Sequence, residues 1–459
     1  MAAATKRCAP MSERNGVSTR DLSGAQRRIY GAALGYQPMR MKPVHFATSF
    51  ILSLTGRAYR LELLNKASVP RATPKAGSRI VDEYVAENLL PVLVEEGRLA
   101  PGIDQAAFRL LRSHLNAAFN NDGGALGPGF APHKTFGVDY SAPTVRYVCA
   151  MSKNHGLSGA FVVRILGATE AGRAVLTACR DVLDLPPPPL EALGRPLLDD
   201  DAQDWVDTYG AQFGEADSSL VLARAEAMLP RTEALARMLA TLLRERSVYA
   251  VRYMIIGLCL WLFSYLMLRR GGDPILLVDA MEGRNMRVRA QSRATYAREL
   301  DRFAHSFDAW HASEGAGADR EDWDAFAQSS EARKVVEDHF RDLGVRIGIV
   351  QPRAPSARRK HIELQADTLR VLAMTVLGEE EVVSVVEFAD RLRSVWHLCS
   401  GSGPGDLDLL RHHGFGPLDA DEDLEPNARA FHALLVRLGL AVSPSDGLTL
   451  CALRASEVI

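Results

Sequence analysis

The sequence predicts a mainly α-helical protein of several domains, with a minor element of short strands. Apolar residues recur at helical spacing along much of the chain, for example through residues 104–119. Residues 253–268 are apolar on every face, which is typical of a helix inside a protein core. Segments with strand character are short, and they lie at residues 275–279, 345–351, 440–442 and 448–453.

Composition divides the chain into four parts. Residues 1–25 are polar and of mixed charge, so we expect a disordered tail. Residues 26–185 are expected to form a helical domain that contains a loop rich in glycine and proline at residues 120–143. A stiff run of prolines follows and marks a boundary. Residues 190–352 then form a second helical domain, and residues 360–459 a carboxy-terminal module.

Amphipathic patterning places the helices of the first domain. They are predicted at residues 43–55, 79–99, 104–119, 144–153 and 159–183. The loop at residues 120–143 carries polar and aromatic groups on a glycine-rich backbone. It is either a small-molecule or partner site, or a loop that only packs over the helices.

In the second domain, a long helical stretch at residues 218–246 is expected to break at Pro230. The helices after it are predicted at residues 253–268, 287–312 and 321–343, and Gly344 is expected to end the last of them. The strand at residues 345–351 is expected to pair with the strand at residues 275–279, which would give this domain a small sheet.

The apolar segment at residues 253–268 has two interpretations. At ~1.5 Å per residue it is about 24 Å long, whereas a bilayer core is ~30 Å thick. Arg252 and Arg269 flank the segment, so it cannot be lengthened without burying a charge. A glycine pair and a short strand follow it, which is a globular pattern. These observations favour a buried core helix, and a membrane-associated scaffold is the alternative.

Overall composition is that of a soluble protein, with 47% hydrophobic and 24% charged residues and a net charge of −2. Because this net charge is small, the protein as a whole has no strong electrostatic attraction to nucleic acid or lipid, and such binding requires a local charged patch. The 6 cysteines are scattered, and no apolar signal segment opens the chain, which favours a cytoplasmic location. Abundant alanine, arginine and leucine favour a bacterial source.

The carboxy-terminal module has a distinct order of elements. Helices predicted at residues 365–377 and 386–398 precede a helix at 426–438, which Pro426 opens and Gly439 ends. A strand, a tight turn and a returning strand complete the chain. This order resembles a winged-helix domain over roughly the last 95 residues.

The resemblance implies that the helix before the hairpin enters the DNA major groove and that the hairpin contacts the phosphate backbone. On that helix, Asn427, Arg429 and His432 are the candidate contacts. The hairpin turn has neither lysine nor arginine, however, and acidic residues crowd the helix start at residues 419–425. Winged helices also dock proteins, and this charge pattern favours docking over DNA binding.

Two clusters of basic residues are further candidates for nucleic-acid binding, because the planar guanidinium group binds two phosphate oxygens. The first cluster precedes and opens the helix predicted at 287–312. The second lies in the segment before the carboxy-terminal module. Their candidate nucleic-acid-binding residues are Arg284, Arg287, Arg289, Arg293, Arg353, Arg358, Arg359 and Lys360.

Catalytic and cofactor motifs are largely missing from the sequence. It has no Gly-Lys dipeptide, which excludes a Walker A phosphate loop, and we expect no cofactor and no metal site. Asp279 and Glu282 admit a metal-dependent nuclease as an alternative, although the usual lysine is missing; otherwise Asp279 caps the turn into the next helix. The leading expectation is a non-enzymatic component of a bacterial nucleic-acid-handling or defence assembly that binds a protein partner, DNA or both.

Overall fold

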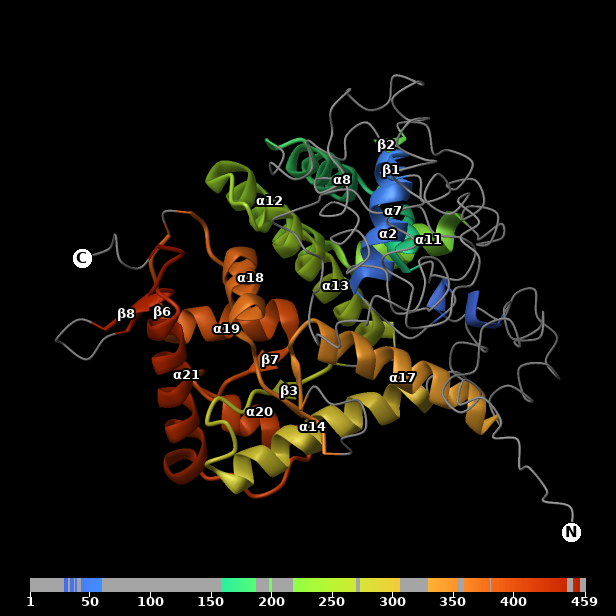
Figure 1. Ribbon diagram of the computed structural model, residues 1–459. Coiled ribbons are helices and arrows are strands. Elements are labelled where there is room, and N and C mark those ends of the chain that lie inside the picture. The colour runs from blue at the N-terminus through green and yellow to red at the C-terminus, as the bar shows by residue number, and fades with distance from the viewer. Residues whose placement is uncertain are drawn as a thin grey trace, which may run out of the picture.

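The computed structural model is mainly helical, as predicted (Figure 1). It describes residues 29–31, 34–36, 38, 43–59, 158–186, 198–199, 218–269, 273–305, 329–352, 359–379, 381–443 and 449–454. The predictions for residues 1–25, 79–99, 104–119, 120–143 and 144–153, and those for Arg353 and Arg358, lie outside these residues.

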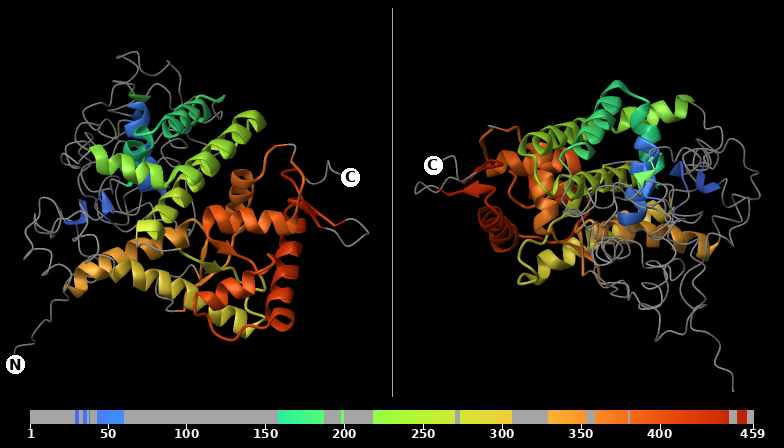
Figure 2. Two further views of the ribbon diagram at one scale, coloured as in Figure 1. Left: turned by 180° about the vertical axis from the view of Figure 1, so that it is seen from behind. Right: turned by 45° about the horizontal axis from the view of Figure 1, so that its top comes forward.

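The amino-terminal half contributes helices that pack side by side (Figures 1 and 2). They are α2 (Pro43–Thr55), α7 (Ser158–Gly167), α8 (Glu170–Leu183), α11 (Ser218–Ala227) and α12 (Leu229–Glu245). Short strands β1 (Ala58–Tyr59) and β2 (Leu198–Asp199) pair antiparallel.

Local sequence signals explain where these helices end. The stretch predicted as one helix at residues 159–183 is two, because Thr169 is extended and its side chain caps α8 by accepting from the Gly172 N–H at 3.1 Å. The predicted break near Pro230 is confirmed, since Pro230 lies in the first turn of α12. Gly159 allows α7 to approach α2 closely, because a Cβ there would lie 2.3 Å from the Phe46 carbonyl oxygen.

The central helix α13 (Ala250–Arg269) is longer than predicted and is surrounded by the others. Of the helices described, it is the one long and apolar enough to cross a membrane, and 89% of its most apolar stretch is buried inside the protein. Two of its large polar side chains are hydrogen-bonded inside the core: the Trp261 indole donates to the Thr232 hydroxyl at 3.1 Å, and the Tyr265 hydroxyl donates to the Leu34 carbonyl at 3.2 Å. One continuous core of buried residues around α13 joins all three predicted folded parts.

A small mixed sheet lies below α13. Strand β3 (Leu276–Leu277) pairs parallel with β7 (Leu398–Cys399), and β4 (Val350–Gln351) pairs antiparallel with β5 (His361–Ile362). A parallel bridge between Val278 and Ile362 joins the two pairs. Helices α14 (Met286–His305) and α17 (Ser330–Arg346) pack beside this sheet (Figure 1).

The predicted direct pairing of residues 345–351 with residues 275–279 is wrong, because β5 lies between them. Gly344 does not end α17 as predicted; the helix continues to Arg346 and packs this glycine against Phe263 and Val350. The chain turns at Gly348 instead, where φ is +80°. Strand β4 is two residues long, and it pairs antiparallel with β5.

The carboxy-terminal residues form helices around a three-stranded antiparallel sheet. The helices are α18 (Ala366–Val376), α19 (Val385–Trp396), α20 (Asp406–His412), a π-helical turn (Ala420–Leu424) and α21 (Glu425–Arg437). The sheet has the order β6 (Val383–Ser384), β9 (Leu450–Cys451), β8 (Ala441–Val442). The predicted strand pair after Gly439 is therefore confirmed. The segment between α19 and α21 carries β7 into the central sheet.

An ion pair links the loop after α18 to α19, and it provides a pH test. Glu381 lies 2.6 and 2.8 Å from the two terminal nitrogens of Arg391, and it accepts from the Gly378 N–H at 2.7 Å. Hydrogen bonds from Arg391 and then from Gly378 lower the pKa of Glu381 from 4.5 to about 2. A carboxyl group whose pKa is lower in the folded state than in the unfolded state stabilises the protein at pH values above the unfolded-state pKa. This stabilisation is lost as pH falls through the folded-state pKa.

We therefore expect Glu381→Gln to reduce the free energy of unfolding at pH 7 by about 1 kcal/mol, the size of a partly exposed ion pair with good geometry. The difference from wild type should shrink as pH falls from about 4.5 toward 2. Urea unfolding at pH 7 and pH 3 measures it, with the more exposed Arg391 partner Glu387→Gln as the control. A difference that is the same at both pH values would contradict the assignment.

Candidate functional site

Asp279 lies two residues after strand β3, and its carboxylate is fully buried. One oxygen accepts from the backbone N–H groups of Met281 (3.1 Å) and Gly283 (3.4 Å), and the other accepts from Arg289 Nε at 2.8 Å. The carboxylate thus caps the turn that leads into α14, and its ion pair with Arg289 orients the guanidinium group of that helix residue.

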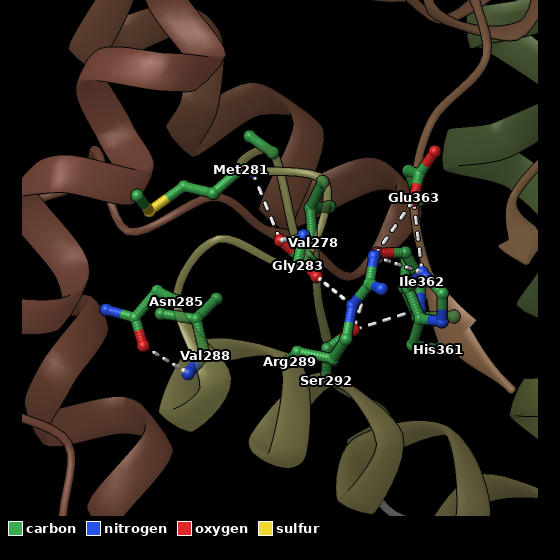
Figure 3. Close-up of polar contacts among 12 residues, drawn as sticks. Val278, Met281, Gly283, Asn285, Val288, Arg289, Ser292, His361, Ile362 and Glu363 are labelled. Carbon is green, nitrogen blue, oxygen red and sulfur yellow. Dashed lines mark hydrogen bonds and ion pairs between the residues drawn. The ribbon is translucent and has the colours of Figure 1, made fainter. Parts of the chain in front are cut away.

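Arg289 reaches from α14 to the end of strand β5 (Figure 3). Its Nη2 lies 3.1 Å from His361 Nε2 and 3.4 Å from Glu363 Oε2, and His361 Nε2 lies 3.0 Å from the same glutamate oxygen. Two carboxylates that follow the neighbouring strands β3 and β5 therefore share one guanidinium group. Sequence reasoning did not connect Glu363 or His361 with Asp279, since only the parallel bridge between Val278 and Ile362 brings them beside it.

Gly283 lets the turn lie against this guanidinium. Its φ is +85°, and a Cβ there would lie 2.4 Å from Arg289 Cζ. Glu282, the other carboxylate of the nuclease alternative, points elsewhere: it is exposed and reaches Arg437 at 4.0 Å. Among the residues that the structure describes, no three His, Cys, Asp or Glu side chains form a group suited to a metal ion.

The arginines predicted as one cluster occupy two flanks of α14. On one flank, Arg287 lies 3.2 Å from Glu422 and 3.7 Å from Asp423. On the other flank lie Arg289, which is bound as above, and Arg293, one helical turn further on and partly buried. Arg284, just before the helix, is exposed, and within the described part of the chain no carboxylate lies within 4 Å of its guanidinium group.

The second basic cluster is described only in part. Arg359 is exposed, whereas Lys360 is 5% exposed and donates to the Pro352 carbonyl. Burial and then the charge of Arg341 lower the pKa of Lys360 to about 8. Lys360 is thus held inside the protein in this structure, and its side chain does not face solvent.

The three candidates on α21 have different environments. Asn427 is fully buried: its carboxamide donates to the carbonyls of Val278 (2.9 Å) and Ser400 (2.8 Å) and accepts from the Ala280 N–H (2.9 Å). It is committed to joining strands β3 and β7, so it does not face a base edge. Arg429 is exposed, 3.6 Å from Glu425, and His432 is partly buried beside Ser402.

The structure brings the turn before α14 beside α21 (Figures 1 and 2). Asn285 donates to Asp423 at 3.0 Å near the start of α21, and Glu282 pairs with Arg437 at its end. The exposed side chains of both elements thus form one face, which we call the α21 surface. It consists of Glu282, Arg284, Met286, Arg287, Glu425, Arg429, Ala433, Val436 and Arg437.

Comparison of the chain with protein-family models, with curated proteins and with solved structures gives no match.

Proposed function

We propose that the protein is a binding component of a larger assembly, and that its carboxy-terminal module is a winged-helix-like unit that docks a partner protein. The observation that carries this proposal is the order of elements. Helix α18, strand β6, helices α19 and α21, and strands β8 and β9 come in this order around a sheet of order β6-β9-β8, with β7, α20 and the π-helical turn inserted between α19 and α21. In a winged-helix domain, the helix in the position of α21 is the one that meets the ligand.

The character of the α21 surface supports a protein as the ligand. Arg287, Arg429 and Arg437 each have a carboxylate within 4 Å, so their charge is largely compensated. Met286 is 68% exposed and Val436 is 42% exposed, which places large apolar groups among these pairs. Protein interfaces are enriched in methionine and arginine, whereas a duplex-binding face needs uncompensated positive charge.

Contacts with strands β3 and β7 and with helix α19 hold α21 rigidly, and with it the α21 surface. Through Asn427, α21 is bonded to the ends of both β3 and β7. Phe431 on the same helix stacks on Phe388 of α19 with ring centroids 6.4 Å apart. A helix held at this many points loses little conformational entropy on binding, which favours affinity.

DNA binding is the second candidate, in which the assembly handles nucleic acid or serves bacterial defence. The observation that favours it is the pair of exposed cations Arg284 and Arg359, for which the described residues provide no ion-pair partner. Phosphate contacts are the physical basis of such binding, and their number is measurable from salt dependence.

The docking proposal is tested with the photo-crosslinking residue p-benzoylphenylalanine at position 436, introduced into the full-length protein in its native cells. The matched control is position 222 on α11, because Leu222 is also 42% exposed. We expect one discrete cross-linked protein from position 436, lost when Arg437 and Arg429 are changed to glutamate, and none from position 222. Identical patterns from both positions would contradict docking through α21.

Binding to labelled duplex DNA across a salt series tests the second candidate, DNA binding. Each phosphate contact contributes a slope of about −0.9 in log affinity against log salt. DNA binding predicts a steep slope that becomes shallower by about 0.9 in the Arg284→Ala variant. No binding at ~50 mM salt would exclude DNA as the ligand of the purified chain.

A further inference from the structure

A cavity of about 360 Å³ lies beside the α21 surface, between the start of α21 and the loop that follows β7. It is open to solvent. Gly401, Gly403 and Gly405 form much of the loop wall, and Ala428 and His432 belong to the helix wall. Its size is at the lower end of the ~300–1,000 Å³ range of ligand sites, which suits one long side chain.

The loop wall offers few free donors. The Gly403 N–H donates to Asp406 at 3.1 Å, and the Ser402 N–H is directed to the Ser400 hydroxyl at 3.4 Å. These two N–H groups are engaged within the loop, so they do not point at a ligand as the free N–H groups of a phosphate-binding loop do. Gly405 has φ +92°, and a Cβ there would meet no atom within 4 Å, which leaves this part of the rim open.

The charged groups of the lining are all acidic. Asp406, Asp421 and Glu425 line the cavity, and its lining has no lysine or arginine. Asp406 is bonded to Arg393, which neutralises it, whereas Asp421 and Glu425 are exposed. Two cations therefore lie close to the lining: Arg393 behind the loop wall, and Arg429, 3.6 Å from Glu425 on the outer face of the helix. Among the described residues, Asp421 has no ion-pair partner within 4 Å. The rim therefore carries net negative charge.

A hydrogen-bonded pair forms the polar part of the inner wall. His432 Nε2 lies 3.2 Å from Ser402 Oγ, and Ser402 Oγ lies 3.0 Å from Ser400 Oγ. Burial lowers the pKa of His432, so the imidazole is neutral at pH 7 and adds no positive charge. Hydroxyl, neutral imidazole and carboxylate groups together present acceptors to whatever enters. Leu407, Leu424 and Ala428 supply apolar contact for a hydrocarbon stem.

We propose that this cavity receives the cationic end of an arginine or lysine side chain from the partner that docks on the α21 surface. The source of the side chain rests on the proposed docking function, whereas the preference for a cation rests on the cavity alone. His432 and Glu425 face the cavity from α21, and Glu425 also borders the α21 surface. A segment lying across α21 thus reaches the cavity with one extended side chain.

The test uses the full-length protein with isotopically labelled histidine, in which the His432 imidazole resonance is assigned from a His432→Gln variant. The probes are capped arginine and capped lysine amides, with capped citrulline amide as the neutral control of the same shape. We expect a saturable shift of the His432 resonance with both cationic probes and none with citrulline. A shift with citrulline equal to that with the cationic probes would overturn the proposal. So would the absence of a shift with the cationic probes up to ~50 mM, because even a single side chain in a site of this size is expected to bind with a dissociation constant below that concentration.

Charge variants give an independent readout. The double variant Asp421→Asn, Glu425→Gln is expected to weaken the cationic probes about tenfold, the factor expected from two partly exposed ion pairs. Asp408→Asn is the control, because Asp408 is an exposed acid on α20 outside the lining. An equal loss in both variants would show a general charge effect and overturn the assignment.

The two proposals fail in different ways. If no partner protein is cross-linked at position 436, the docking proposal is contradicted. Probe binding at His432 would still establish a cation site. If agmatine or spermidine then binds more tightly than capped arginine, the ligand is a free amine, and a partner side chain is excluded. Capped arginine binding more tightly than agmatine supports a protein source.

Discussion

Replacing Asn427 by alanine is expected to lower the free energy of unfolding by about 3 to 5 kcal/mol. Three buried backbone groups lose their partner: the carbonyls of Val278 and Ser400 and the N–H of Ala280. Each unsatisfied buried group costs ~1 to 3 kcal/mol, and the truncated side chain also leaves a small void. The loss separates α21 from the ends of β3 and β7 at the same time.

Urea unfolding followed by circular dichroism measures this effect, with Arg429→Ala as the control two residues along the same helix. Arg429 is exposed, so we expect its removal to cost less than about 1 kcal/mol. Asn427→Asp keeps the size of the side chain but points a carboxylate oxygen at two carbonyls, and it is expected to destabilise at least as much as alanine at pH 7. An Asn427→Ala variant as stable as the control would contradict the role described.

Replacing Arg289 by methionine is expected to destabilise the protein by about 3 to 5 kcal/mol, because Asp279 is left as a buried charge without its cation. Methionine retains much of the hydrocarbon stem, so the effect reports the guanidinium group. Thermal unfolding and urea midpoints measure it, and Arg284→Met is the exposed control on the preceding turn.

A double-mutant cycle separates this charge effect from lost packing. Adding Asp279→Asn to Arg289→Met removes the uncompensated charge and is expected to recover part of the loss, giving a coupling energy above ~1 kcal/mol. The amide also keeps an oxygen for the N–H groups of Met281 and Gly283. Simple additivity of the two variants would show that Asp279 and Arg289 do not act as a pair.

Sequence patterning succeeded where the cause of a structure is local. Helix α2 has the predicted bounds, the break before α12 lies beside the predicted proline, and the strands after Gly439 pair as expected. A proline, a glycine or a run of apolar residues constrains its own neighbours, so its effect is readable without the rest of the chain.

Site predictions were less informative, because the role of a polar side chain depends on what lies opposite it. Arg287 and Arg289 read alike in the sequence, yet one meets the acids before α21 and the other meets Asp279 and Glu363. Asn427 reads as a surface residue on an amphipathic helix, yet it is fully buried. Periodicity gives the face of a helix, but it does not give the element against which that face packs.

The amino-acid sequence by itself determined that this protein is mainly helical, that residues around 253–268 form a helix, and that a strand pair closes the chain. Only the tertiary structure decided that β5 lies between β3 and β4, that α14 divides its arginines between two flanks, and that the turn before α14 shares a surface with α21. The reason is physical: hydrophobic periodicity and backbone preferences act over a few residues, whereas strand order and ion pairing depend on contacts between segments far apart in the chain.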